Sequence, residues 1–155
     1  MWMGIALLAA KRSTCYRGNV GCVIVESDIR PVSIGYNGPP SGEPHCKGNN
    51  CEISGNGGCL RSLHAEENAL SRFFVQENPF GGAPHYYDLY VTASPCEHCA
   101  RKIVTNGKIN RVFYQSPYRL TTGIDILHEN KIEVFRLSPS GYLVNEKTGT
   151  VLEAN

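Results

Sequence analysis

The chain has 155 residues, enough for one domain with a hydrophobic core, and we expect a single domain over residues 1–155. Its 15 lysine and arginine side chains nearly balance 14 aspartate and glutamate side chains, which leaves a formal net charge of +1. A chain without a broad basic field is not expected to bind long nucleic acids or anionic membranes. A few well-placed cations can still hold a small anion.

The first ten residues are apolar and precede Lys11 and Arg12. A secretory signal has the opposite order of basic and apolar residues, and this run is too short to span a bilayer. We therefore expect a soluble, cytoplasmic protein with an amphipathic first helix at 2–12.

The apolar periodicity and the turn-forming residues predict a mixed α/β protein. The predicted elements, in chain order, are a helix at 2–12, strands at 20–26 and 31–36, an irregular stretch at 37–59, a helix at 63–77, a strand at 87–93, a helix at 96–107, a strand at 111–115, a helix at 123–131 and a strand at 132–137. A first hairpin followed by alternating helices and strands predicts a mixed, roughly five-stranded sheet with helices on both faces. The C-terminal tail, 137–155, can add a small hairpin.

Seven cysteines are many for this length, and their number is odd. An odd number without a signal peptide does not favour a disulfide framework. Cys22 lies inside the apolar run 20–26, where a lone cysteine acts as a small hydrophobic side chain. The remaining cysteines lie near histidines, as the ligands of a metal do.

One histidine and two cysteines have the pattern of a catalytic zinc site. Cys96 and Cys99 flank the start of a predicted helix, which turns both sulfurs to one side, where free backbone amides stabilise thiolates. His64 supplies a third ligand and leaves the fourth position for water, as in catalytic zinc sites. Glu66 can reach such a water and move its proton, whereas Glu67 points elsewhere.

A closed, purely structural zinc site is the alternative for these residues, and it would give Glu66 no role. The combination of H-A-E at 64–66 with P-C-x-x-C at 95–99 is the signature of zinc deaminases that act on nucleobases. We therefore predict a catalytic zinc, with Glu66 as the proton-transfer group. His98 lies between the two cysteines and is expected to be exposed to solvent.

Several stretches around this signature resemble the deoxycytidylate (dCMP) deaminases of the cytidine deaminase superfamily. They are RSTCYRGNVGCVIV, SIGYNGPPSG, CLRSLHAEENAL, LYVTASPCEHCARKI and RVFYQSPYR, within residues 2–136. The resemblance implies a three-layer α/β/α sandwich, hydrolysis of dCMP to dUMP and ammonia for thymidylate synthesis, and a homohexamer. It also implies activation by dCTP with Mg²⁺ and inhibition by dTTP.

The same resemblance implies roles for residues that would bind the nucleotide. Arg17 would hold the 5′-phosphate, which suits a guanidinium because it offers several donors in a fixed fork. Judged on the residue alone, Arg17 can equally be a solvated surface arginine. Asn37 would bond the sugar hydroxyl, Tyr118 would close over the substrate, and Arg119 is a weaker phosphate candidate.

Two further roles follow from the resemblance. Backbone groups at Ala65 and Ser94 would read the edge of the base. The regulatory dCTP with Mg²⁺ would bind near Gly38, in the loop 35–42 and between subunits, because the glycines of this loop let the backbone approach phosphates.

The remaining cysteines predict a second, structural zinc site. A closed four-cysteine site from Cys15, Cys46, Cys51 and Cys59 would order a loop that has too few apolar residues to order itself by burial. The resemblance supports Cys15 and Cys46, and the other two ligands are inferred from chemistry. His45 can replace one of them, and four unrelated thiols remain the alternative.

Two other functions remain open at this point. A tRNA adenosine deaminase or a DNA cytosine deaminase uses the same zinc ligands, but it would need a basic and aromatic surface for a polynucleotide. The near-neutral charge disfavours such an enzyme. A non-catalytic, zinc-binding nucleotide sensor would not require Glu66.

Overall fold

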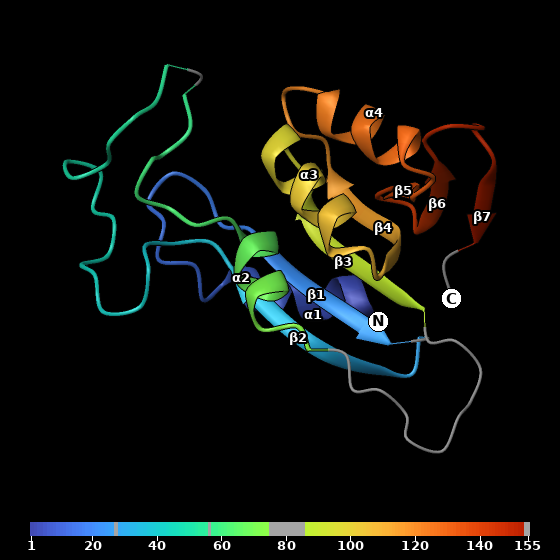
Figure 1. Ribbon diagram of the computed structural model, residues 1–155, viewed down its shortest axis with the longest axis horizontal. Helices are drawn as coiled ribbons and strands as arrows, with labels where there is room; N and C mark the ends of the chain where they lie inside the picture. The colour runs from blue at the N-terminus through green and yellow to red at the C-terminus, as the bar shows by residue number, and fades with distance from the viewer. Residues whose placement is uncertain (27, 56, 75–85, 154–155) are drawn as a thin grey trace.

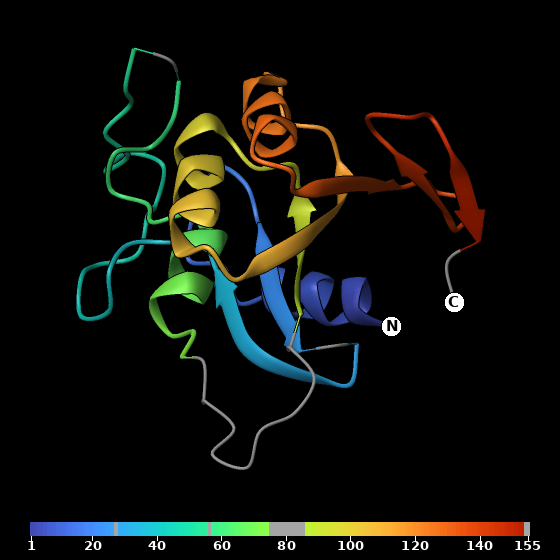
Figure 2. The same cartoon turned by 45° about the vertical axis from the view of Figure 1, so that its right-hand side comes forward.

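The computed structural model describes residues 1–26, 28–55, 57–74 and 86–153. Its elements are α1 (Trp2–Ala10), β1 (Gly21–Glu26), β2 (Arg30–Tyr36), α2 (Ala65–Ser71), β3 (Tyr87–Ala93), α3 (Glu97–Asn106), β4 (Ile109–Ser116), α4 (Thr122–Glu129), β5 (Glu133–Leu137), β6 (Tyr142–Asn145) and β7 (Val151–Glu153). Helix α1 covers one face of the sheet, and α2, α3 and α4 cover the other (Figure 1, Figure 2). The predicted three-layer α/β/α sandwich is confirmed.

The strands form one mixed sheet in the order β2-β1-β3-β4-β5-β6-β7. The three central strands β3, β4 and β5 are parallel, and every other neighbouring pair is antiparallel. The predicted number of roughly five strands is wrong. The tail forms the expected hairpin, but its first strand also pairs with β5, through Phe135 and Asn145, and so extends the sheet to seven strands.

Strand β1 is apolar from Cys22 to Val25 because both of its faces are covered there. Cys22 and Ile24 contact the core under α2, α3 and α4, while Val23 and Val25 contact α1 through Trp2 and its neighbours. These four side chains have no exposed surface. The interpretation of Cys22 as a buried hydrophobic side chain is therefore confirmed.

The first helix differs from its prediction. It ends at Ala10 rather than at residue 12, and it is not amphipathic, because Leu7 and Leu8 are 41% and 63% exposed on the side away from the sheet. No helix within the described ranges is both long enough and apolar enough to cross a membrane.

The helix predicted at 63–77 is shorter in the structure. It starts at Ala65 and ends at Ser71, and residues 75–77 lie outside the described ranges. Phe73 leaves the helical path and packs edge-on against Tyr87, with ring centroids 4.8 Å apart. Phe74, predicted on the same apolar face, is 81% exposed. The spacing of the two aromatic residues therefore suggested a longer helix than packing allows.

The strand directions bring four segments of the chain to one edge of the sheet. Because β1 is antiparallel to β2 and β3, its start lies beside the carboxyl ends of both, and the end of the parallel β4 lies there too. Backbone hydrogen bonds join these segments, from Asn37 N–H to the Val20 carbonyl (3.1 Å) and from Ser94 N–H to the Ser116 carbonyl (2.9 Å). Ligands of α/β sheets bind at such an edge. The segment between β2 and α2 also projects there, at the opposite end of the molecule from the hairpin β6–β7 (Figure 1).

Helix α2 approaches β2 so closely that position 35 has no room for a side chain. A Cβ on Gly35 would lie 2.2 Å from the carbonyl oxygen of Ala65 and 2.5 Å from the backbone nitrogen of Ala69. This contact sets the height of the start of α2 above the sheet.

We expect Gly35→Ala to lower the free energy of unfolding by about 1–3 kcal/mol, because the methyl group overpacks α2 against β2. Urea denaturation followed by circular dichroism measures the change. Gly4→Ala in α1 is the control, because an added Cβ there has no heavy atom within 4 Å. It should stabilise the protein by about 0.5–1 kcal/mol. Equal stability of the two variants would contradict the close approach of α2.

Candidate active site

His64 lies immediately before α2 and is the residue that caps it. Its backbone is extended, with φ −77° and ψ 157°, so its side chain is not part of the helical surface. The Glu67 carboxylate accepts a hydrogen bond from the His64 backbone N–H at 2.8 Å, as the reciprocal half of a capping box. The extended backbone of His64 and its hydrogen bond to Glu67 together set the direction in which the imidazole points.

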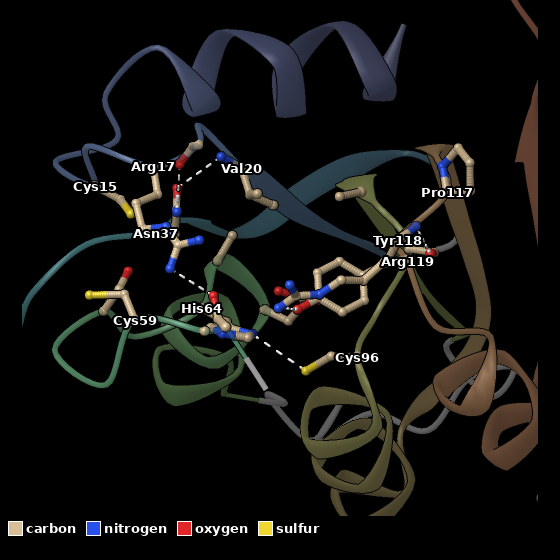
Figure 3. Close-up of a pocket in the computed structure, with 18 residues that line it drawn as sticks. Cys15, Arg17, Val20, Asn37, Cys59, His64, Cys96, Pro117, Tyr118 and Arg119 are labelled. Carbon is tan, nitrogen blue, oxygen red and sulfur yellow. Dashed lines mark hydrogen bonds between the residues drawn. The ribbon is translucent and has the colours of Figure 1, made fainter. Parts of the chain in front are cut away.

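Cys96 and Cys99 occupy the start of α3, and both sulfurs face His64. Cys96 caps the helix and Cys99 is fully buried in its first turn. The two sulfurs lie 3.5 and 3.3 Å from Nδ1 of His64 (Figure 3 shows the first contact). The structure thus brings together the three residues predicted to hold the catalytic metal.

The donor set and its spacing fit zinc. Tetrahedral zinc with bonds of about 2.3 Å to sulfur and about 2.0 Å to nitrogen places these atoms about 3.5 Å from each other. The observed separations of 3.3 and 3.5 Å agree with that value. Two cysteines and one histidine also leave a fourth position for water or substrate.

The protonation of the cluster is consistent with metal binding. A hydrogen bond from Cys99 lowers the pKa of Cys96 to about 4, so that this residue is a thiolate. The hydrogen bond with Cys96 raises the pKa of His64 to about 9, and the hydrogen bond with Cys96 together with burial raises the pKa of Cys99. Zinc needs a neutral imidazole and thiolates, so a bound cation would displace the protons that these groups hold.

Glu66 lies in the first turn of α2 and is 3% exposed. Burial raises the pKa of its carboxyl group to about 7. It lines a pocket of about 390 Å³ together with His64 and Cys96. An acidic group and a metal-binding cluster thus lie side by side in the lining of one pocket. This is the arrangement needed to move protons to and from a bound ligand.

The same pocket is lined by all six residues predicted to bind the substrate: Arg17, Asn37, Ala65, Ser94, Tyr118 and Arg119. Arg17 enters from the β1 side, while Tyr118 and Arg119 enter from the β4 side (Figure 3). Gly38, predicted near an effector, does not line this pocket.

Two guanidinium groups flank the backbone of Gly57. Arg17 Nη1 donates a hydrogen bond to the Gly57 carbonyl at 2.7 Å, and a Cβ on Gly57 would lie 2.8 Å from Arg119 Nη1. Gly57 has φ +79°, a conformation that glycine adopts without strain. Within the described part of the chain, neither guanidinium pairs with a carboxylate. The two positive charges therefore favour an anion at this end of the pocket.

Asn37 and Ser94 organise the pocket through their side chains. The amide oxygen of Asn37 accepts hydrogen bonds from Val20 N–H (2.8 Å) and Ser13 Oγ (2.7 Å), and its amide nitrogen donates to the Gly18 carbonyl (2.8 Å). One amide hydrogen is left for a ligand. Only the backbone groups of Ser94 were predicted to have a role. In the structure its hydroxyl oxygen also accepts a hydrogen bond from the Tyr118 backbone N–H at 2.7 Å.

Ser13 and Ser94 were not predicted to position other site residues through their hydroxyls. No spacing rule in the sequence could have indicated either contact, since the partners lie 24 residues away in both cases.

A second thiol cluster lies beside the pocket. Cys46, Cys51 and Cys59 have sulfurs within 4.8 Å of one another. Burial, followed by a hydrogen bond with Cys59, raises the pKa of Cys46 to about 11. Burial opposes ionisation of Cys59 as well, but hydrogen bonds from the backbone of Arg61 and from the neighbouring thiols outweigh it and lower its pKa.

The fourth ligand of this cluster remains a prediction. Cys15 is outside the set of three, although Cys46 N–H donates to the carbonyl of the adjacent Thr14 at 3.2 Å. His45, the proposed substitute, is exposed and lines a neighbouring pocket together with Cys15 and Cys46.

We expect the purified protein to contain about two zinc ions per chain, because the two clusters use separate ligands. Cys96→Ser should remove one ion and Cys46→Ser the other, as measured by elemental analysis. Cys22→Ala is the control, since Cys22 is buried and belongs to neither cluster. One zinc ion in the wild-type protein would remove the second site, and two in Cys96→Ser would contradict the first.

Comparison with known proteins agrees with this geometry. Residues 1–116 match the family described as the cytidine and deoxycytidylate deaminase zinc-binding region. The chain belongs to this family.

Relatives and a solved structure are similar over most of the chain. The deoxycytidylate deaminase of Saccharomyces cerevisiae is 39% identical over an alignment of 128 positions that covers 77% of this chain and 38% of that protein. ComE operon protein 2 of Bacillus subtilis is 37% identical, over 76% of this chain and 59% of that protein. The chain therefore spans less than two thirds of the length of each of these two relatives. The dCMP deaminase of cyanophage S-TIM5, solved with dCMP and dUMP, is 33% identical with a TM-score of 0.70, over 87% of this chain and 93% of that chain.

Proposed function

We propose that this protein hydrolyses dCMP to dUMP and ammonia as a zinc-dependent deaminase. The observation that carries the proposal is the buried Glu66 beside a zinc-binding donor set, in a pocket whose other end holds Arg17 and Arg119. The first two features suit hydrolysis of an amidine, and the guanidinium groups suit a nucleotide phosphate. The names of the phage and yeast relatives point to the same substrate.

The reaction exchanges the amino group at C4 of cytosine for the oxygen of water. Zinc at the donor set would act as the Lewis acid that makes this water nucleophilic near neutral pH. Glu66 accepts the proton of the water and delivers it to N3 of the base, and a second transfer releases the amino group as ammonia. Water and dCMP are thereby converted to dUMP and ammonia without an oxidant or a covalent enzyme intermediate.

Substrate orientation follows from the two ends of the pocket. Arg17 and Arg119 bind the 5′-phosphate on either side of Gly57, and the free amide hydrogen of Asn37 donates to the sugar. Ala65 and Ser94 present backbone groups to the base, and the Ser94 hydroxyl holds the backbone of Tyr118, whose ring closes the pocket. A pocket of about 390 Å³ is of the size that encloses a small ligand.

We expect Glu66→Gln to retain zinc and to lower kcat for dCMP by about 10²–10⁴-fold, because an amide keeps the shape of the side chain but cannot transfer a proton. The decrease of cytosine absorbance measures turnover, and elemental analysis establishes that the metal is present. Near-normal kcat in the zinc-loaded variant would refute the role of Glu66.

We expect Arg17→Ala to lower kcat/KM for dCMP by about 10- to 100-fold, which corresponds to the loss of roughly 1.5–3 kcal/mol from hydrogen bonds to a charged group. Activity on deoxycytidine, which lacks the phosphate, should stay at its wild-type level. Arg72→Ala is the matched control, because Arg72 is exposed at the end of α2 and does not line the pocket. An equal loss for both substrates would show that Arg17 does not recognise the phosphate.

Regulation by nucleotides is a separate part of the proposal. A second pocket has a volume of about 430 Å³ and is lined in part by Thr14. Gly38 packs directly against Thr14, because a Cβ added to Gly38 would lie 2.0 Å from Thr14 Oγ1. The pocket is lined by Lys11, Arg12, Ser13, Thr14, Cys15, His45 and Cys46. Cations and hydroxyls without a carboxylate favour the phosphates of dCTP, which would bring Mg²⁺ with them. We propose that dCTP binds here and favours the substrate-competent state, that dTTP opposes it, and that the states belong to a homohexamer.

We expect a plot of initial rate against dCMP to be sigmoidal alone, hyperbolic with dCTP and Mg²⁺, and shifted to higher dCMP with dTTP. An effector changes the curve only if its affinity differs between two states. Curves that are hyperbolic and superimpose under all three conditions would remove the regulatory part and leave the catalytic part intact.

The thiol ligands also bear on location. Both proposed zinc sites need reduced cysteines, and the seven cysteines in the described residues form no disulfide. We propose that the protein works in a reducing compartment, the cytoplasm.

A further inference from the structure

The Glu67 carboxylate connects the two helices that carry the zinc-binding donors. One oxygen, Oε2, accepts the backbone N–H of His64 at 2.8 Å. The other, Oε1, accepts a hydrogen bond from Lys102 Nζ at 2.5 Å and lies 3.3 Å from His98 Nε2. The Glu67 side chain is only 13% exposed.

The partners of Oε1 lie on the face of α3 that carries a buried ligand. His98 and Lys102 are four residues apart and therefore neighbours on the helix surface, and Cys99 is three residues before Lys102 on the same side. Oε2, in contrast, holds the backbone of His64. One carboxylate thus joins the residue that supplies the imidazole to the helix that supplies the sulfurs.

A capping box alone would require only the contact with His64. The contact with Lys102 adds nothing to the cap of α2, because Lys102 belongs to another helix. It ties α3 to the start of α2 beside the donors, where Nδ1 of His64 lies 3.3–3.5 Å from the two sulfurs.

We propose that Glu67 is a positioning residue that sets the spacing of the donors His64, Cys96 and Cys99 and thereby the affinity of the site for zinc. The inference rests on the metal site of the proposed function and deepens it. Glu67 does not touch the substrate, and its effect passes through the metal ligands.

Three variants separate the two contacts of the Glu67 carboxylate, one with the His64 backbone and one with Lys102. Glu67→Ala removes both contacts, Glu67→Gln keeps an acceptor for His64 N–H but loses the ion pair, and Lys102→Met loses the ion pair alone. Arg101→Ala is the control, since Arg101 forms an exposed pair with Glu97 elsewhere on α3. Zinc affinity is measured by competition with a chelator, and the geometry of the site by the absorption spectrum of the Co²⁺-substituted protein. Each variant is also prepared with Cys46→Ser, so that only one thiol cluster binds the ion.

Zinc affinity should fall about 10- to 100-fold in Glu67→Ala, which is the usual effect of removing a group that orients a metal ligand. It should fall by less in Glu67→Gln and Lys102→Met and remain unchanged in Arg101→Ala. The Co²⁺ spectrum should change in the same order, and excess zinc should restore kcat of Lys102→Met. A loss of stability alone would not change the Co²⁺ spectrum of the folded protein, so the spectrum separates a positioning role from a merely structural one.

Unchanged zinc affinity and an unchanged Co²⁺ spectrum in Glu67→Ala would overturn the proposal. If Glu67→Ala does not fold, Lys102→Met decides the question by the same two measurements. Wild-type protein without cobalt–thiolate absorption would overturn the metal site and the proposal together. A normal wild-type spectrum with unaffected variants would overturn only the role of Glu67.

Discussion

The site depends on the close approach of one imidazole nitrogen to two sulfurs that follow it by 32 and 35 residues in the chain. The starts of α2 and α3 must meet for these two distances to be 3.5 and 3.3 Å. Helix α2 is set by its close approach to β2 at Gly35, and α3 follows directly from the carboxyl end of β3. The sheet that orders β2, β1 and β3 side by side is therefore what makes the donor set possible.

The same sheet edge supplies the remaining groups. The antiparallel β1 starts where the parallel β3 and β4 end, so that Arg17 and Arg119, from distant parts of the sequence, meet around one glycine. Glu66 is buried beside the zinc-binding donors, and the two guanidinium groups are exposed, so the pocket has a buried carboxyl group at one end and two positive charges at the other. In the proposed function, hydrolysis and phosphate binding would thus occur at separate ends of one cavity.

The sequence could predict the parts that depend on local rules. A helix start orients the cysteine pair in the same way wherever it occurs, and the strand at 87–93 was predicted with its observed bounds. The end of α2 and the pairing of the C-terminal hairpin depend instead on tertiary packing. Phe73 turns inward onto Tyr87 and ends a helix that spacing alone would continue, and the hairpin β6–β7 joins the sheet through a pairing that no local pattern indicates. Glu67 was expected only to point away from the metal, and its partner Lys102 is 35 residues away.

The most direct test of the account is to follow the oxygen atom. The zinc-loaded protein is incubated with dCMP, dCTP and Mg²⁺ in water enriched in oxygen-18, and the nucleotide product is analysed by mass spectrometry together with the ammonia released. We predict dUMP that carries one solvent-derived oxygen at C4, formed in equal amount to ammonia and much faster than deoxyuridine forms from deoxycytidine. No dUMP, or dUMP without the solvent oxygen, would contradict a metal-assisted hydrolysis in which Glu66 transfers the proton.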